Sequence, residues 1–443
     1  MNLKNVCEKI TEVYLLLFAT VHLLYLGFSG YSHIFEAKIL TFCTINILYF
    51  VSLLIALFLF WDKNKKRLAQ ALRRRLNVAH ICVLLYMIFT VISGLLSEYF
   101  PKTIFGISRF EGMFTICIYG FMFFAVSFFT VSIKRVFYAF TVSASLFCAL
   151  CILQILGFNS LHLYPEGMNF YDAGVKYTTA FIGTIGNTNL SGAFICLALP
   201  IFLVLLFKSK NKKHCYLLIP VALLTFTALT MDVTSTILGL ISAVIISFPL
   251  ILSFRKRNTI IYVLSVSAVI TIILFLILFY PPKTGFIHEL SRILHGDISD
   301  SFGSGRIRIW KNVLGEIPDS PVFGKGPDTM MMENFAPFER YYPALGKVKR
   351  TSIDVAHNEF LNILYHQGFL ALLAYLAFLF FVIKAWIKNR QNIVVLALGC
   401  GIVCYLAQSF FTFSMCLTAP YFWICAGLII GMSDKIIKEP ALC

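Results

Sequence analysis

Charged residues are scarce in this sequence. Asp, Glu, Lys and Arg make up 13% of the 443 residues, whereas 59% of the residues are hydrophobic and 45 are phenylalanine. Soluble globular domains carry a charged fraction of about 25%, so the composition excludes an ordinary soluble domain. Acidic residues are the scarcer sign, 21 against 37 basic residues. The net charge of +16 therefore has to be explained by where the basic residues lie.

Apolar runs take up most of the chain. A helix needs about 20 apolar residues to cross a hydrocarbon core, and most of the runs approach that length. The runs cover residues 13–30, 38–60, 78–96, 112–131, 136–156, 186–207, 215–230, 236–254, 259–280, 368–387, 391–413 and 417–433. We therefore predict an all-α polytopic membrane protein with about 12 transmembrane helices.

The basic residues follow the predicted topology. If the N-terminus is cytoplasmic, the inner segments hold 23 of the 37 Lys and Arg residues and only five acidic residues. This is the positive-inside pattern. It predicts that both termini are cytoplasmic, in a multi-pass protein of the cytoplasmic (inner) membrane. Because topology and membrane lipids account for the basic charge, we expect no nucleic-acid partner.

Two further scarcities limit the possible functions. The 13 cysteines lie mostly in apolar runs, with none in residues 281–367, so we expect neither a disulfide framework nor a zinc site. The helix interiors hold almost no ionisable residue, with His22 and His80 the nearest. Ion-coupled transporters usually need intramembrane carboxylates or histidines, which counts against transport. The first run lacks a small-residue cleavage site and is interpreted as an uncleaved helix.

One long polar segment interrupts the apolar runs. Residues 281–367 carry seven of the 14 prolines and, in the predicted topology, form a large outer-face loop between the ninth and tenth spans. They separate residues 1–280, with spans one to nine, from residues 368–443, with spans ten to twelve. We predict that this loop contains amphipathic helices and carries active-site residues.

An amphipathic helix is expected in the middle of the loop. Ser304 can cap a helix that ends at Pro318. At about 100° per residue, one face holds the apolar side chains, namely Ile307, Trp310, Val313, Leu314 and Ile317. Arg306 falls on this face, whereas Arg308 lies about 200° away. A partly buried Arg306 needs an anion, either a protein carboxylate or a substrate phosphate. Arg308 is either solvated or a second phosphate contact.

A second helix is expected near the end of the loop, capped by Asp354. His357 would lie in its first turn, where the helix dipole favours a neutral imidazole that can act as a general base. The alternative is a local capping role for His357. Glu359, Asn362 and His366 recur at helical spacing, which is also the pattern of an ordinary solvated face.

Two further segments reach the predicted outer edge of the membrane. Arg109 and Glu111 could form an interfacial ion pair, or Arg109 could face a substrate cavity. The sequence GTIGNTN at residues 183–189 permits close helix packing and also offers backbone N–H groups to an anion. Both interpretations of each segment stay open.

The motifs together resemble the O-antigen ligase and polysaccharide polymerase superfamily. The similarity runs from about residue 97 to residue 368. Its motifs are RFEG at 109–112, GTIGNTN at 183–189, RIRIW at 306–310, PVFGKG at 321–326 and HNEFL at 357–361. Each motif alone is weak, but their order and spacing are fairly specific.

The resemblance implies a glycosyltransferase that needs no metal and no cofactor. Such enzymes move a glycan from a polyprenyl-diphosphate carrier to an acceptor sugar hydroxyl, on a lipid-linked sugar, a growing chain or a protein, at the extracytoplasmic face. It implies that His357 activates the hydroxyl and that Arg306, Arg109 and Arg308 hold the diphosphate. We expect the remaining site residues to line the cavity, namely Gly186, Asn187, Asn189, Trp310, Asn358 and Glu359.

One position departs from the family pattern. Many members carry an arginine after Thr-Ser at the start of the eighth span, where this chain has Thr236. Either another cation replaces that arginine or donor binding differs. The sequence does not distinguish a ligase from a polymerase. The alternative from another functional class is a lipid-linked oligosaccharide flippase or other transporter.

Overall fold

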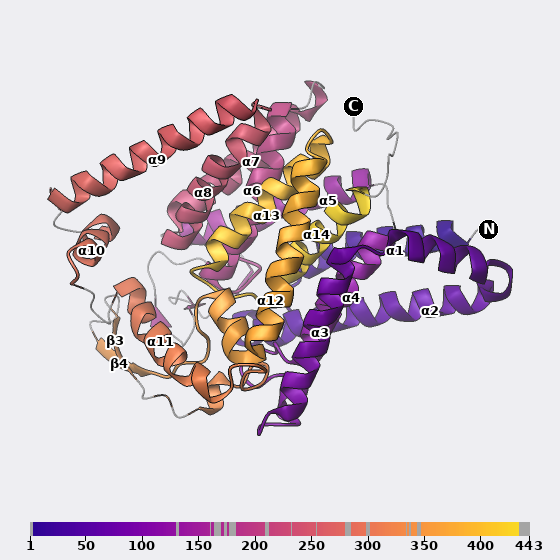
Figure 1. Ribbon diagram of the computed structural model, residues 1–443, viewed down its shortest axis with the longest axis horizontal. Coiled ribbons are helices and arrows are strands. Elements are labelled where there is room, and N and C mark those ends of the chain that lie inside the picture. The colour runs from indigo at the N-terminus through magenta and orange to yellow at the C-terminus, as the bar shows by residue number, and fades with distance from the viewer. Residues whose placement is uncertain are drawn as a thin grey trace.

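The computed structural model describes most of the chain. It covers residues 3–129, 133–159, 161–163, 170–171, 175–176, 183–208, 212–231, 233–253, 255–279, 285–297, 302–333, 335, 338–342 and 347–433. Within these residues the protein is almost entirely α-helical (Figure 1). The helices are α1 (Leu3–Leu17), α2 (Ile34–Arg75), α3 (Val78–Leu96), α4 (Met113–Phe128), α5 (Ile133–Ile155), α6 (Thr188–Lys208), α7 (Leu218–Thr230), α8 (Thr234–Ile251), α9 (Lys256–Phe279), α10 (Gly285–Leu294), α11 (Phe302–Glu316), α12 (Glu359–Lys388), α13 (Ile393–Ser409) and α14 (Ala419–Ser433).

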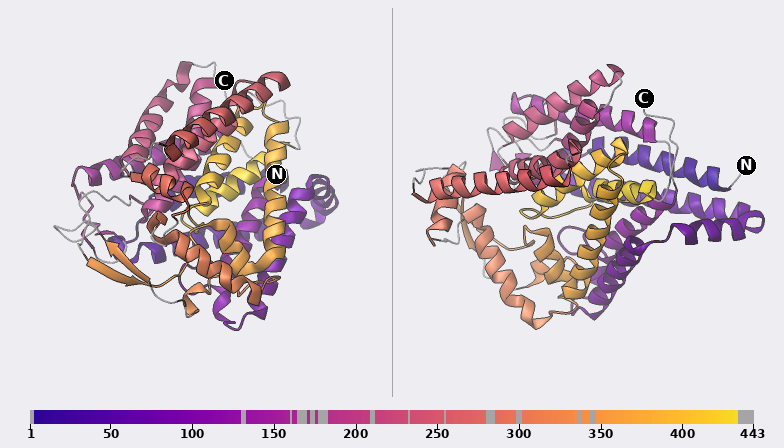
Figure 2. Two further views of the ribbon diagram at one scale, coloured as in Figure 1. Left: turned by 60° about the vertical axis from the view of Figure 1, so that its left-hand side comes forward. Right: turned by 45° about the horizontal axis from the view of Figure 1, so that its top comes forward.

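Two short antiparallel hairpins accompany the helices. The strands β1 (Phe170–Tyr171) and β2 (Val175–Lys176) form the first, and β3 (Phe338–Tyr342) and β4 (Lys347–Thr351) form the second. The second hairpin lies at the periphery, beyond α11 (Figure 2). Neither hairpin was predicted from the sequence.

The helices confirm a membrane protein with several spans. Within the described residues, seven helices are long and apolar enough to cross a membrane: α2, α3, α5, α6, α8, α9 and α12. The shorter helices α4, α7, α13 and α14 are also apolar. Each predicted apolar run overlaps a helix. The count of twelve spans, the cytoplasmic termini and the outer-face position of residues 281–367 stay predictions.

Helix α6 lies at the centre of one half of the bundle, packed against α7, α8 and α13. In the most apolar 18-residue stretch of α6, 83% of the residues are buried, against 6% in α9. Helix α9 packs against α8 and α10 and runs along the edge of the molecule (Figure 1). Glycines permit the close packing. A Cβ at Gly401 of α13 would collide with the Leu197 carbonyl of α6.

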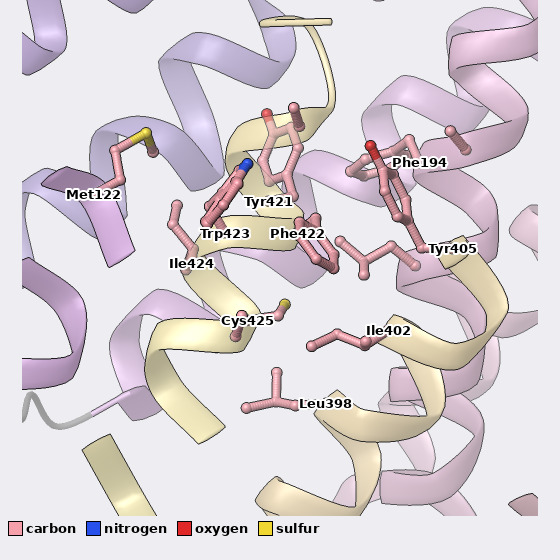
Figure 3. Close-up of a cluster of buried hydrophobic side chains, with 14 of the residues drawn as sticks. Met122, Phe194, Leu398, Ile402, Tyr405, Tyr421, Phe422, Trp423, Ile424 and Cys425 are labelled. Atoms are coloured by element: carbon pink, nitrogen blue, oxygen red, sulfur yellow. The ribbon is translucent and has the colours of Figure 1, made fainter. Parts of the chain in front are cut away.

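Helix α12 packs along α3, and α14 packs along α4. Figure 3 shows how α14 inserts three consecutive aromatic residues, Tyr421, Phe422 and Trp423, into the core. The Phe422 ring stacks on Tyr405 of α13 at 5.3 Å. The Trp423 ring lies nearly parallel to the ring of Tyr119 at 6.2 Å. Tyr119, Phe422 and Trp423 of this layer also line the pocket described in the next section.

The bundle interior corrects one expectation, because it contains a buried lysine. Lys38 of α2 is 1% exposed, and its Nζ donates to the carbonyl oxygens of His22 at 2.6 Å and Leu23 at 3.0 Å. These carbonyls end a short π-helix, Phe18–His22, where a cation complements the free acceptors. His22 Nδ1 in turn lies 3.0 Å from the Tyr421 hydroxyl. The interior is therefore less free of ionisable residues than the sequence suggested.

Candidate active site

A polar pocket opens where α3, α4, α12 and α14 meet the loops that connect them. The empty space in and in front of it amounts to about 650 Å³, open solvent included. Its polar lining comes from residues far apart in the sequence, namely Arg109, Glu111, Asp328, Asp354, Glu359, Asn362, His366, Gln367 and Ser414. Its aromatic lining consists of Tyr86, Tyr119, Tyr375, Phe413, Phe422 and Trp423.

Arg109 lies in the pocket and is held there by Asp354. Its Nε and Nη2 donate to the same Asp354 oxygen, at 3.0 and 2.6 Å. Its guanidinium carbon lies 4.8 Å from the centre of the Phe413 ring, a cation–π distance. Arg109 thus lines a pocket, and the prediction that it faces a substrate there stays a prediction. The alternative pairing with Glu111 is wrong, since the ion-pair partner is Asp354.

Asp328 fixes the loop that carries Arg109. One oxygen of its carboxylate accepts the backbone N–H groups of Ile107, Ser108 and Arg109 at 2.8 to 3.0 Å. The other oxygen accepts the Ser108 hydroxyl at 2.8 Å. Asp328 is only 5% exposed, and a Cβ at Gly106 would collide with it. Successive N–H groups form a nest for an anion, and here a protein carboxylate occupies it.

Glu111 and Glu359 both hold the loop between α13 and α14. Glu111 accepts the backbone N–H of Cys416 at 2.7 Å and the Tyr119 hydroxyl at 2.8 Å. Glu359 accepts the backbone N–H of Ser414 at 2.7 Å. Burial raises the pKa of Glu111 well above its ordinary value, and these hydrogen bonds oppose the shift only in part. The two carboxylates thus fix the segment on which Phe413 lies.

The α12 helix breaks at Gly368. This residue has φ 81° and ψ −179°, a conformation essentially limited to glycine. Lys325 N–H donates to the Tyr365 carbonyl at 3.0 Å, and Gly326 N–H donates to the His366 carbonyl at 2.9 Å. On the other side of the break, Phe369 N–H donates to the Pro321 carbonyl at 2.9 Å. The turn-rich segment 318–327 therefore satisfies the backbone groups that the break frees.

His357 lies just before α12 rather than inside its first turn. The helix begins at Glu359, and Asn358 is its N-cap, accepting the Leu361 N–H at 3.0 Å. The expectation that Asp354 caps this helix is wrong, because Asp354 pairs with Arg109. His357 has a left-handed backbone, with φ 49°. Its ring meets Phe413 edge to face, with centroids 5.4 Å apart, so His357 and Arg109 contact the same aromatic ring.

Helix α11 is anchored beside His357 through Trp310. The indole Nε1 donates to the Ala356 carbonyl at 2.9 Å, one residue before His357. Ile309 and Val313 are buried together with Met330, Ile353, Ala356 and Tyr365. The buried face therefore includes Ile309, and the predicted Leu314 is 54% exposed. Arg306 precedes Trp310 and Val313 by four and seven residues, and so shares their face. Arg306 and Arg308 are both half-buried and lie outside the pocket lining.

The glycine-rich sequence at 183–189 serves packing and helix capping. A Cβ at Gly186 would collide with Ile34 of α2. Asn187 precedes α6 and accepts the Leu190 N–H at 3.2 Å. The carbonyl of Asn189 accepts from Gln408 Nε2 at 3.1 Å. These three residues lie outside the lining of the pocket described above, as do Trp310 and Asn358, whereas Glu359 lines it.

Thr236 is also a packing residue. It is fully buried in α8, and a Cβ at Gly192 of α6 would collide with its hydroxyl oxygen. An arginine at this position would have to separate the two helices. The small Thr236, where many family members have an arginine, therefore permits α6 and α8 to pack closely.

The role of Asp328 and the ion pair between Arg109 and Asp354 were not predicted from the sequence. Asp328 follows Gly326-Pro327, a turn signal, but its partners lie 219 to 221 positions earlier in the chain. The spacing of Glu359, Asn362 and His366 did contain a signal, since this face lines the pocket.

Comparison with known proteins relates the chain to one protein family. No curated protein matches the chain. Residues 220–376 match the family described as O-Antigen ligase. The matched part includes α11, Asp328, Asp354 and His357, whereas Arg109 and Glu111 lie outside it. The match supports assignment of this chain to the O-antigen ligase and polysaccharide polymerase superfamily.

Proposed function

We propose that this chain is a membrane glycosyltransferase that moves a glycan from a polyprenyl-diphosphate carrier to a sugar hydroxyl of an acceptor, at the extracytoplasmic face of the inner membrane. The family match supports a ligase- or polymerase-like membrane enzyme. The observation that carries the residue assignment is the position of His357. It contacts Phe413, which lines the pocket beside Arg109, and it follows Ala356, which Trp310 of α11 holds.

In the proposed reaction His357 is the general base. Its neutral imidazole takes the proton of the acceptor hydroxyl while the hydroxyl oxygen attacks the anomeric carbon of the donor. The new glycosidic bond forms as the bond from the anomeric carbon to the diphosphate oxygen breaks. The diphosphate leaves with the electron pair, and the configuration at that carbon inverts. The proton remains on His357 until solvent removes it.

The arginines of α11 have the chemistry to bind the diphosphate leaving group. A guanidinium can donate two parallel hydrogen bonds to phosphate oxygens and offset the charge that develops there. We assign this role to Arg306, with Arg308 as a second contact. Arg109 already gives two donors to Asp354, and its Nη1 points to the Met415 sulfur at 4.0 Å. Arg109 therefore meets a substrate only through that remaining side.

The direct test is reconstitution. Purified protein in proteoliposomes should join a defined polyprenyl-diphosphate oligosaccharide to at least one acceptor among a lipid-linked sugar, a growing chain and a protein. Product should form equally with and without a chelator, since no step requires a metal. The acceptor used would separate a ligase from a polymerase. Absence of any glycosidic product with every acceptor would contradict the proposal.

A flippase for lipid-linked oligosaccharides is the second candidate. The observation in its favour is the buried polar group around Lys38 and His22, since ionisable residues inside a bundle often mark transport paths. The same proteoliposomes discriminate the two. Movement of the carrier lipid across the bilayer without a new glycosidic bond would support the flippase.

A further inference from the structure

One face of α12 forms a continuous wall of the pocket before the break at Gly368. Glu359, Asn362, Ile363, His366 and Gln367 all line the pocket. Their spacing of three and four residues puts them on one side of the helix. In the sequence this pattern could have been a solvated face, but Asn362 and Ile363 are at least half-buried and the last two polar residues, His366 and Gln367, are 3% and 5% exposed.

His366 is held so that one ring nitrogen is left for a ligand. Its carbonyl accepts from Gly326 N–H at 2.9 Å and from the Ser93 hydroxyl at 2.7 Å. Its Nδ1 lies 3.1 Å from the Asn362 carbonyl oxygen. A carbonyl only accepts, so Nδ1 carries the proton, and Nε2 of the neutral ring is an acceptor. Nε2 is buried and has no hydrogen-bond partner among the described residues.

Gln367 presents a second open group. Its Oε1 is buried and also lacks a hydrogen-bond partner within the described part of the chain. Buried polar atoms are nearly always hydrogen-bonded, and an exception needs an explanation. Two such atoms on adjacent residues that line one pocket indicate a ligand with hydroxyl groups.

The charge of the pocket narrows the class of ligand. Among the described residues, Glu111, Asp328, Asp354 and Glu359 line it, and Arg109 is the single lysine or arginine that does so. Arg109 is paired with Asp354. Like charges brought together cost several kcal/mol, so the Asp328 and Asp354 carboxylates disfavour a phosphate or an acidic sugar in this pocket. Glu111, whose protonated form burial favours, adds little to that repulsion. Carboxylates accept hydrogen bonds from hydroxyl groups well.

The aromatic lining fits the same class. Trp423 lies nearly parallel to Tyr86, with centroids 6.3 Å apart, and Tyr86 lies 5.4 Å from Tyr375. A sugar ring has apolar C–H faces and polar hydroxyl edges. An aromatic lining beside polar groups matches that division.

We propose that this pocket is the subsite for a neutral, hydroxyl-rich sugar ring, with His366 Nε2 accepting one sugar hydroxyl and Gln367 Oε1 a second. The inference rests on the glycosyl-transfer function proposed above and names the part of the substrate that the pocket takes. The diphosphate then stays outside the pocket, toward α11. His357, which contacts Phe413 at the pocket wall and follows Ala356 beside α11, lies between the two parts.

Two substitutions at His366 isolate the Nε2 contact. An asparagine amide stands near the position of Nδ1 and can keep the bond to the Asn362 carbonyl, whereas a glutamine amide reaches the position of Nε2. Full-length protein in nanodiscs is titrated with glucose and N-acetylglucosamine, and binding is followed by saturation-transfer NMR. We expect His366→Asn to weaken binding by at least about tenfold. His366→Gln should stay within about threefold of the wild type.

Control variants and control ligands test whether neutral-sugar binding depends on these two side chains. His33→Asn, at an exposed histidine, should leave neutral-sugar binding unchanged. Gln367→Met should weaken it, since it removes the amide oxygen at similar volume. Thermal unfolding of each variant separates a lost contact from a lost fold. Should a variant unfold, the wild-type preference for neutral sugars over glucuronic acid and inorganic diphosphate still tests the subsite.

The contradicting results are distinct from a failure of the proposed function. The subsite is overturned if neutral sugars fail to bind the wild type, or bind His366→Asn and Gln367→Met equally well. It is also overturned if glucuronic acid or inorganic diphosphate binds at the same residues as tightly as glucose. Because this binding needs no turnover, absence of glycosyl transfer in proteoliposomes would contradict the enzyme assignment alone.

Discussion

Arg109 and Arg306 are two arginines of the proposed site, and the elements that carry them are held in different ways. Arg109 belongs to a loop whose backbone is tied to Asp328 and whose guanidinium is tied to Asp354. Arg306 belongs to a helix that an apolar cluster and a hydrogen bond from Trp310 help to anchor. The carboxylate partner of Arg109 fixes its side chain before substrate arrives. We propose that Arg109 shapes the pocket and, as part of the function proposed above, that Arg306 meets the donor.

The largest effect is expected from Asp328→Ala, which removes the acceptor of three backbone N–H groups. Each buried donor left unsatisfied costs about 1–3 kcal/mol, so stability should fall by at least about 3 kcal/mol. Thermal unfolding of the purified protein measures this. Asp297→Ala is the control, because the Asp297 side chain is exposed and its pair with Arg292 lies at the surface. An unchanged unfolding temperature in Asp328→Ala would show that the 106–109 loop does not need its clamp.

Substitution of the two arginines should affect different properties, donor binding for Arg306 and stability for Arg109. Arg306→Ala should lower kcat/KM for the donor by about 10- to 100-fold, because it removes charged hydrogen bonds of about 1.5–3 kcal/mol, with little change in unfolding temperature. Arg109→Ala should destabilise the fold by about 1–2 kcal/mol, because it leaves the partly exposed Asp354 without its cation. Initial rates at varied donor concentration, with unfolding curves, measure both. A loss of stability in Arg306→Ala together with a loss of only donor kcat/KM in Arg109→Ala would contradict the different roles of the two arginines.

Trp310→Phe tests the link from α11 to His357. Phenylalanine keeps most of the apolar contact and loses the hydrogen bond to the Ala356 carbonyl. We expect a loss of about 1 kcal/mol in stability and a fall of a few-fold in kcat, because the turn before His357 is held less firmly. Tyr25→Phe, at an exposed ring, is the control. If both variants behave like the wild type, Trp310 does not position the base.

The smallest effect is a pH dependence at Glu111. Burial raises the pKa of Glu111 in the folded protein, so folding favours the protonated form. The associated stability is present below the unfolded pKa of about 4.3 and is lost as pH rises toward the folded pKa. Glu111→Gln should therefore gain stability relative to the wild type as pH rises from about 5 to about 8. Glu36→Gln, at an exposed carboxylate, should not. If the free energy of unfolding changes with pH in the same way for Glu111→Gln and the wild type, Glu111 does not have the raised pKa of a buried carboxyl group.

Local composition allowed most of the helices to be predicted. The apolar runs mark them because a bilayer requires apolar residues and internally satisfied backbone groups, both properties of single segments. The start of α12 shows the limit. Asp354 and Asn358 are both good N-cap residues, and only the distant Arg109 decides that Asp354 forms an ion pair and Asn358 caps the helix.

The candidate site was predictable only in part for the same reason. The Glu359–Asn362–His366 spacing and the position of Arg306 on the apolar face of α11 could be read from helical periodicity. The Asp328 clamp joins residues more than 200 positions apart, and no local pattern contains that pairing. Lys38 was missed because a lysine at the edge of an apolar run usually reaches the interface, whereas here two carbonyl oxygens hold it inside.

The central claim is that His357 is the general base of glycosyl transfer, and His357→Ala in the reconstituted reaction tests it most directly. Donor binding should persist, because the arginines are unchanged, while the rate of product formation should fall by at least about 100-fold. His33→Ala is the matched control and should retain wild-type turnover. Formation of glycosidic product by His357→Ala at close to the wild-type rate would contradict the account.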